Sequence, residues 1–238
     1  MYAPSNKLRE LTLPDMEPIT YGSVWLWQHD MHDAKQAPCH TIVCGAARPS
    51  DLDQPVMASL MLSDKRTAEK RKIVSERLSL AMDEALGKDW VETWHIGLPN
   101  SNDSKYMTQH GNIVWLHNII KAFGLLDYAK ERVGPLNQNI KKYDSKLSKK
   151  DNMVNLGMGW GWMPGCAVDP KLNYEEDFAK CPEENRERLQ AAIMFVHDQL
   201  MTSPSKDACE DEKNEKHRVP FDWKTSYDMR PWTAYPER

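Results

Sequence analysis

The chain has 238 residues and a mass of 27.5 kDa, which suffices for one large domain or two small ones. It carries 31 basic and 35 acidic residues, so its net charge of −4 lacks the basic excess of a nucleic-acid-binding domain. No apolar run approaches the roughly 18 residues needed to cross a bilayer, and the first residues lack the charged and apolar regions of a secretory signal. The five cysteines, an odd number, argue against a full disulfide framework and favour a reducing compartment.

Large apolar side chains stand out against a hydrophilic background. The chain has nine Trp and 13 Met residues, while its mean hydropathy is −0.69 and 40% of its residues are hydrophobic. Aromatic side chains in so lean a composition either fill a compact core or bury against another molecule. Composition alone leaves both alternatives open.

The first part of the chain predicts an extended arm, one helix and one strand. Residues 1–18 contain three prolines without a helical or strand period, which favours an extended arm. Residues 19–35 carry a helical stripe of apolar side chains. Residues 40–44, HTIVC, lie between Pro38 and Gly45 and are β-rich, which is typical of a buried strand.

A further helix is predicted after this strand. Ser50 is an expected N-cap in front of an apolar face formed by Leu52, Val56 and Leu60. Pro55 lies inside this pattern and predicts a kink.

Three longer helices follow, according to their apolar periods. They span residues 67–86, 112–132 and 183–201. Gly87 is the predicted stop of the first helix, and the pair Gly134 and Pro135 the predicted stop of the second. Residues 136–182 are lysine-rich and then glycine-punctuated, and the chain beyond Ser203 is polar and charged. The whole pattern is mostly helical with one strand, which needs a neighbouring strand to satisfy its backbone.

Five His and Cys residues form the first candidate site. They are His29, His32, Cys39, His40 and Cys44. Structural zinc sites place two close ligand pairs on either side of a longer loop, and these positions do not match that spacing. The preferred interpretation is a polar helix end followed by a strand whose cysteines are small core residues.

The remaining motifs carry no recognisable chemistry. Residues 157–162, GMGWGW, are rich in glycine, as phosphate-binding loops are. However, no predicted strand precedes them and no Gly-Lys-Ser/Thr follows. A packed turn anchored by Trp160 and Trp162 is therefore favoured over a phosphate loop. The sequence contains neither a G-x-S-x-G elbow nor an H-E-x-x-H motif. The residues alone therefore predict no active site.

One segment resembles a known family. Residues 40–53, HTIVCGAARPSDLD, resemble the last barrel strand and the following helix of aldo-keto reductases. Several later segments are similar to the C-terminal helical extension of one aldo-keto reductase subgroup, so that the similarity spans about residues 20–201. These segments are residues 94–100, 112–116, 122–129 and 163–165. The resemblance implies a vestigial NADP site at four positions, namely Gly45, Arg48, Ser50 and Asp51.

The same resemblance implies a missing barrel. In the family, the catalytic Asp, Tyr, Lys and His lie on earlier strands, which this chain would lack. A complete barrel takes about 250 residues before any extension, and hydride transfer needs a formed pocket around the nicotinamide. The resemblance therefore predicts a non-catalytic chain without a working cofactor.

The predicted fold is mainly α with a remnant of α/β, a truncated aldo-keto reductase-like partial TIM barrel with a helical extension and extended termini. The predicted parts are an N-terminal arm (1–18), a barrel remnant (19–64), a helical extension (65–201) and a C-terminal tail (202–238). The expected function is a structural or assembly subunit of a larger complex. Its Trp- and Pro-bearing termini would bind other protein subunits, in an intracellular and specifically mitochondrial setting. The alternative is the C-terminal half of a split NADP-dependent oxidoreductase whose barrel is completed by another chain.

Overall fold

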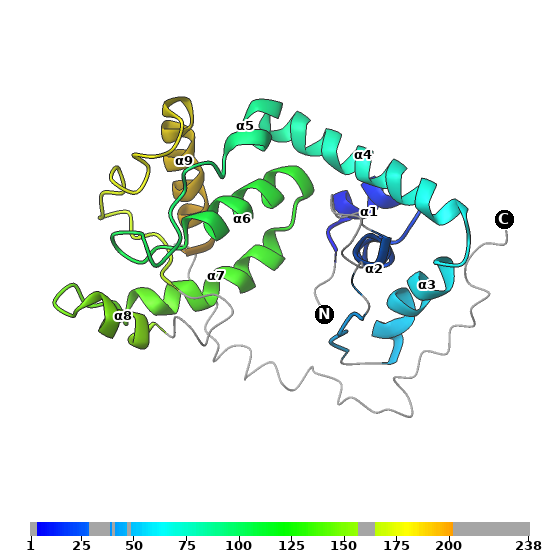
Figure 1. Cartoon of the computed structure of the whole chain (residues 1–238), viewed down its shortest axis with the longest axis horizontal. Helices are drawn as coiled ribbons and strands as arrows, with labels where there is room; N and C mark the ends of the chain where they lie inside the picture. Colours follow the sequence, from blue (N-terminus) through cyan, green and yellow to red (C-terminus); the bar gives the residue numbers. More distant parts are fainter. Residues whose placement is uncertain (1–3, 29–38, 40, 47–48, 157–164, 202–238) are drawn as a thin grey trace. The chain divides into compact units, whose positions relative to one another are not determined.

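The computed structural model describes residues 4–28, 39, 41–46, 49–156 and 165–201 (Figure 1). These residues are mainly helical, which confirms the predicted mainly α class. The described ranges contain no strand, and their one β-bridge pairs Thr108 with Cys166 in parallel. The chain divides into two compact units: one is built around residues 9–78, and the other around residues 5–8 and 79–204.

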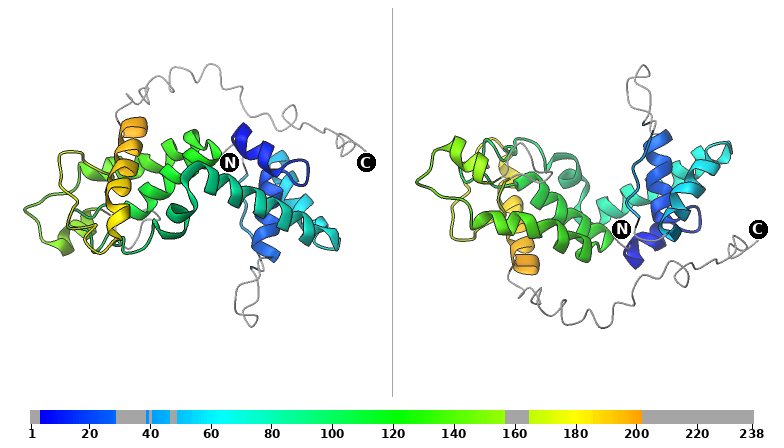
Figure 2. Two further views of the ribbon diagram at one scale, coloured as in Figure 1. Left: turned by 90° about the horizontal axis from the view of Figure 1, so that it is seen from above. Right: turned by 90° about the horizontal axis from the view of Figure 1, so that it is seen from below.

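The first unit is a small helical cluster. Its elements are most of α1 (Asn6–Thr12), α2 (Pro18–Gln28), the 3₁₀ turn η1 (Pro49–Leu52), α3 (Asp53–Met61) and the first part of α4 (Arg66–Leu86). Helices α2 and α3 lie side by side (Figures 1 and 2). Between them Met16, Val24 and Ala58 are buried, and the Ile19 amide donates to Gln54 Oε1 at 3.0 Å.

Arg77 ties the α1–α2 connection to α4 within this unit. Its guanidinium donates to the carbonyl oxygens of Leu11, at 3.1 Å, and Leu13, at 2.8 Å, and pairs with the Asp15 carboxylate. Arginine suits this position because its planar group presents several donors at fixed angles.

The second unit holds the larger core. Its elements are the rest of α4, α5 (Lys88–Thr93), α6 (His110–Phe123), α7 (Leu126–Ile140), α8 (Lys149–Asn155), α9 (Glu183–Val196) and the π-helical turn η2 (His197–Met201). Helix α6 packs against α9, and Ile113, Leu116, Leu189 and Ile193 are among the fully buried side chains. Their spacing at three and four residues places them on one face of each helix.

The predicted extended arm at residues 1–18 is wrong for its described part, because Asn6–Thr12 form α1. Pro4 and Pro14 flank this helix instead of interrupting it, and Pro18 is the first residue of α2. That position tolerates proline, since its missing N–H would have no helical partner there.

The predicted buried strand is also wrong. Residues 41–46 form neither strand nor helix, and Val43 is 94% exposed; His40 lies outside the described residues. A strand needs a neighbour for its backbone hydrogen bonds, and the described residues offer none. The described part of the predicted barrel remnant, residues 19–64, contains helices and coil but no strand.

The helix predicted to begin at Ser50 starts later. Ser50 lies in η1, and Leu52 precedes α3 without a capping side chain. Pro55 is the third residue of α3, so it causes no break, because the first-turn amides have no helical acceptor.

The long helix predicted at residues 112–132 is two helices. Gly124, in the left-handed region with φ +68°, ends α6, and α7 begins at Leu126. The predicted stop at Gly134 and Pro135 is wrong, since α7 continues to Ile140. Burial of Val133 and Leu136 on its inner face offsets the hydrogen bond that the proline removes.

Two predicted helices are confirmed. Helix α4 ends at Leu86 before Gly87, whose φ is +83°. Helix α9 runs from Glu183 and continues as η2 to Met201. The lysine-rich region contains one helix that the sequence did not predict, α8, whose N-cap Ser148 accepts the Asp151 amide at 3.2 Å.

Candidate functional site

An apolar stripe runs along the outer side of α3. Val56 and Leu60 lie four residues apart on one face of α3, and Leu52, the last residue of η1, precedes Val56 by the same interval; the three are 39% (Leu52), 42% (Val56) and 59% (Leu60) exposed. On the inner side Pro55 and Ala58 are buried. The period predicted from the sequence is therefore present, but the face that it marks points to solvent. An aligned apolar stripe differs from scattered exposed residues because it offers a continuous surface to a partner. We call these three side chains the α3 stripe.

A second feature, in the other unit, is a cavity built on the bridge between Thr108 and Cys166. The Cys166 amide donates to the Met107 carbonyl at 2.8 Å, and the Gln109 amide donates to the Cys166 carbonyl at 2.9 Å. Gly165 allows this approach: its φ is +108°, and a Cβ there would lie 2.7 Å from the Met107 carbonyl oxygen.

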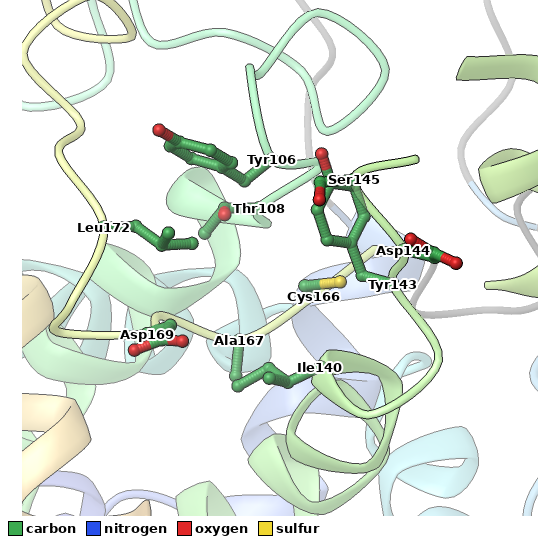
Figure 3. A pocket seen from close by; sticks show the side chains of 10 residues that line it. All are labelled: Tyr106, Thr108, Ile140, Tyr143, Asp144, Ser145, Cys166, Ala167, Asp169 and Leu172. Carbon is green, nitrogen blue, oxygen red and sulfur yellow. The ribbon is translucent and has the colours of Figure 1, made fainter. Parts of the chain in front are cut away.

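The cavity has a volume of about 320 Å³ (Figure 3), at the lower end of the range for small-molecule sites. Its lining comes from four segments: the loop before α6, the end of α7, the turn after it, and the segment after Gly165. The lining residues are Tyr106, Thr108, Ile140, Tyr143, Asp144, Ser145, Cys166, Ala167, Asp169 and Leu172.

Two tyrosines form an aromatic corner of this cavity. The rings of Tyr106 and Tyr143 meet edge to face, with centroids 6.5 Å apart and planes at 85°. The buried ring of Tyr174 packs edge to face against Tyr106, with ring centroids 5.7 Å apart. The Tyr174 hydroxyl accepts from the Asp169 amide and donates to the Asp169 carbonyl. Burial raises the pKa of Tyr174 to about 12, against smaller opposing effects of the Asp169 backbone and of Thr108.

The Cys166 thiol and the Tyr143 phenol of the lining are neutral at physiological pH. Burial raises the pKa of the Cys166 thiol to about 12, so it is a poor nucleophile. Burial is also the largest cause that raises the pKa of Tyr143, and Cys166 adds to it. These groups can bind a ligand, but they supply neither a thiolate nor a phenolate for chemistry.

A buried polar network lies beside the cavity and fixes its first segment. Asp177 accepts from the Ser104 hydroxyl at 2.7 Å and from the Lys105 amide at 2.9 Å, and it bonds to His110 Nε2 at 2.7 Å. The Ser104 oxygen in turn accepts from the Thr108 amide at 3.0 Å. All three side chains of the network are buried.

This Ser, Asp and His set is not arranged for nucleophilic catalysis. Both Ser104 and His110 bond to the same oxygen of Asp177, so the imidazole is not the acceptor of the serine proton. His110 Nδ1 is buried without a hydrogen-bond partner. Nε2 faces the carboxylate of Asp177 at 2.7 Å, so the proton of that hydrogen bond is carried by Nε2. The network acts as a clamp between residues 104–110 and Asp177.

Hydrogen bonds decide the charge state of this clamp. Burial by itself would raise the pKa of Asp177, but the bonds from His110, the Lys105 amide and Ser104 outweigh it and hold that pKa below its usual value. The carboxylate is therefore ionised at neutral pH.

The residues predicted from the sequence lie elsewhere. Of the four positions of the expected NADP site, Gly45 is exposed in coil with open space around it, Ser50 and Asp51 are neighbours in η1, and Arg48 lies outside the described residues. None of the described three lines the cavity.

The candidate metal ligands are only partly described. His29, His32 and His40 lie outside the described residues, as does the glycine-rich segment 157–162. Cys39 and Cys44 are free cysteines. Within the described ranges no group of His, Cys, Asp and Glu could hold a metal ion, and no described helix is both long and apolar enough to span a membrane.

Comparison with protein-family models, with curated proteins and with solved structures finds no match to this chain. The α3 stripe and the cavity must therefore be interpreted from their own geometry. The cavity and its clamp carried no signal in the sequence, because their residues meet only after folding.

Proposed function

We propose that this chain is a non-catalytic structural or assembly subunit that binds another protein of a larger complex through the α3 stripe. The observation that carries the proposal is the exposure of Leu52 at the end of η1 and of Val56 and Leu60 on α3, at intervals of four residues. Burying such a stripe removes apolar surface from water at about 25 cal/mol per Å². A partner with an apolar groove or helix face has the matching chemistry.

The proposed evolutionary origin of the chain rests on the sequence alone. Descent from an aldo-keto reductase rests on residues 40–53 and on the similarity of the later segments. The proposed subunit role does not depend on that descent, since the stripe would bind a partner whatever the origin of the chain.

Leu60→Lys tests the proposal directly. Leu60 is 59% exposed, so a lysine there leaves the core intact but places a charge in the proposed interface. Leu80 of α4 is also 59% exposed and lies outside the stripe, which makes Leu80→Lys a matched control.

The readout is the native mass of the tagged full chain after gentle extraction from its own cells. We expect the wild-type chain and Leu80→Lys to run in the same assembly, well above 27.5 kDa, and Leu60→Lys to run alone. A wild-type chain that runs alone would refute the proposal, as would an assembly that survives Leu60→Lys. NADPH-dependent aldehyde reduction by the purified chain would refute its non-catalytic part.

A further inference from the structure

We propose that the cavity between Tyr106, Thr108, Tyr143 and Cys166 binds a small organic cation, a protonated amine with an aromatic or apolar body. This site is separate from the α3 stripe, and it belongs to the unit built around residues 79–204. Three features support it: a hydroxyl without a hydrogen-bond partner, an aromatic corner, and lining charges that are all carboxylates.

The hydroxyl of Thr108 supplies the hydrogen-bond acceptor. The side chain is 1% exposed, and Figure 3 shows its oxygen turned toward the space between Tyr106 and Tyr143. Oγ1 lies near enough to the Tyr174 hydroxyl to affect its pKa, but it makes no hydrogen bond of normal geometry. A buried hydroxyl without a partner costs free energy, and a ligand N–H would remove that cost.

The aromatic corner suits a cation. The ring planes of Tyr106 and Tyr143 are nearly perpendicular. The face of an aromatic ring attracts an ammonium group that lies within about 6 Å of its centre. Below them Ile140 and Ala167 form an apolar floor, and Leu172 lies at the side next to Thr108 (Figure 3). An amine that carries a ring can therefore bury its body on the floor and turn its N–H toward Thr108.

The charges that line the cavity are acidic. They belong to Asp144 and Asp169, whereas no Lys or Arg is among the described lining residues. Figure 3 shows the Asp144 carboxylate turned away from the two rings and Asp169 at the opposite edge of the lining, next to the apolar floor, so Asp169 is the carboxylate that the variants below test. One of its oxygens accepts the Lys171 amide at 3.0 Å, and a carboxylate has further acceptor positions.

One resident cation lies nearby. Lys105 Nζ is 5.7 Å from the centre of the Tyr106 ring, but Glu176 pairs with it at 3.0 Å. Its charge is thereby balanced by Glu176 outside the lining, so the charged side chains that line the cavity itself remain Asp144 and Asp169.

Three probes with the same ring separate the contributions of charge and shape. Benzylammonium, benzyl alcohol and benzoate are titrated into the full chain by calorimetry. We expect benzylammonium to bind about tenfold more tightly than benzyl alcohol, because a hydrogen bond involving a charged group adds roughly that factor. Benzoate, which would meet the carboxylates of the lining, should show no binding.

Two variants locate the binding. Thr108→Val should weaken benzylammonium binding about tenfold without lowering the melting temperature, because the lost hydroxyl makes no hydrogen bond. Asp169→Asn should weaken benzylammonium binding about fivefold by removing one charge and leave benzyl alcohol unaffected. Thr20→Val, a buried threonine of the other unit, is the control and should not change the affinity for any probe.

The outcomes decide the proposal without reference to the α3 stripe. Loss of benzylammonium affinity in Thr108→Val and Asp169→Asn, but not in Thr20→Val, supports the assigned site. The assignment is overturned if benzylammonium does not bind, if benzoate binds as tightly, or if the two cavity variants bind it as the wild-type chain does.

Discussion

Removal of the Asp177 carboxylate should destabilise the unit that holds the cavity. In Asp177→Ala three donors lose their acceptor: the Ser104 hydroxyl, the Lys105 amide and His110 Nε2. Each bond to a buried carboxylate contributes about 1.5 kcal/mol, so the loss of three bonds should lower the free energy of unfolding by about 4.5 kcal/mol. At roughly 2–4 °C per kcal/mol for a chain of this size, the melting temperature should drop by about 9–18 °C.

Urea unfolding followed by far-UV circular dichroism measures this loss, and calorimetry measures the melting temperature. Asp127→Ala is the control, because that carboxylate is 98% exposed in its pair with Lys130, and its loss should change the free energy of unfolding by less than about 0.5 kcal/mol. A loss below about 1 kcal/mol in Asp177→Ala would refute the interpretation of the network as a clamp.

The clamp also predicts the direction of a pH dependence. The pKa of Asp177 is lowered on folding, so its contribution to stability is fully present above the pKa of the unfolded chain, about 3.9. It is lost as the pH falls through the lower pKa of the folded chain. Asp177→Asn removes this titration, so its stability should fall less steeply than that of the wild-type chain below about pH 4.

Two further predictions concern local structure. In urea unfolding, Gly97→Ala should lower the free energy of unfolding by several kcal/mol more than Gly87→Ala. Both glycines have positive φ, but a Cβ at Gly97 would lie 2.2 Å from the Lys180 carbonyl oxygen, whereas a Cβ at Gly87 would meet nothing within 4 Å. Equal losses in the two variants would contradict the close approach at Gly97. Hydrogen bonds from the side chain and the backbone amide of Arg66 lower the pKa of Asp64 to about 2. An NMR titration of its carboxyl carbon should therefore show a higher pKa in Arg66→Gln, which keeps only the bond from the backbone amide, than in the wild-type chain. Equal pKa values in the two chains would contradict the pairing.

The sequence predicted helices well where one period runs between clear stops. Helix α4 before Gly87 and helix α9 after Pro182 are of this kind. The period failed at Gly124, because Phe123 and Leu125 on either side are both apolar and continue the pattern across a left-handed residue.

The α3 stripe shows a different limit. Its period correctly placed Val56 and Leu60 on one face of α3, but a period does not tell whether that face covers the chain's own core or a partner. The expectation of a buried strand at residues 40–44 failed because strand propensity states nothing about the presence of a neighbouring strand.

The cavity and the clamp could not be predicted from local patterns. Thr108 and Cys166 become neighbours only through the parallel bridge, and Ser104 meets Asp177 from 73 positions away. Single polar residues in loops carry no periodic signal, and the positive φ of Gly165 becomes evident only once the fold is known.

Photo-crosslinking from the α3 stripe tests the central claim most directly. A benzophenone amino acid replaces Val56 in the full chain, and a second version carries it at Leu80 outside the stripe; both chains are irradiated in intact cells. The subunit role predicts a discrete adduct above 27.5 kDa from position 56 and none from position 80. No adduct from position 56, or the same adducts from both positions, would contradict it.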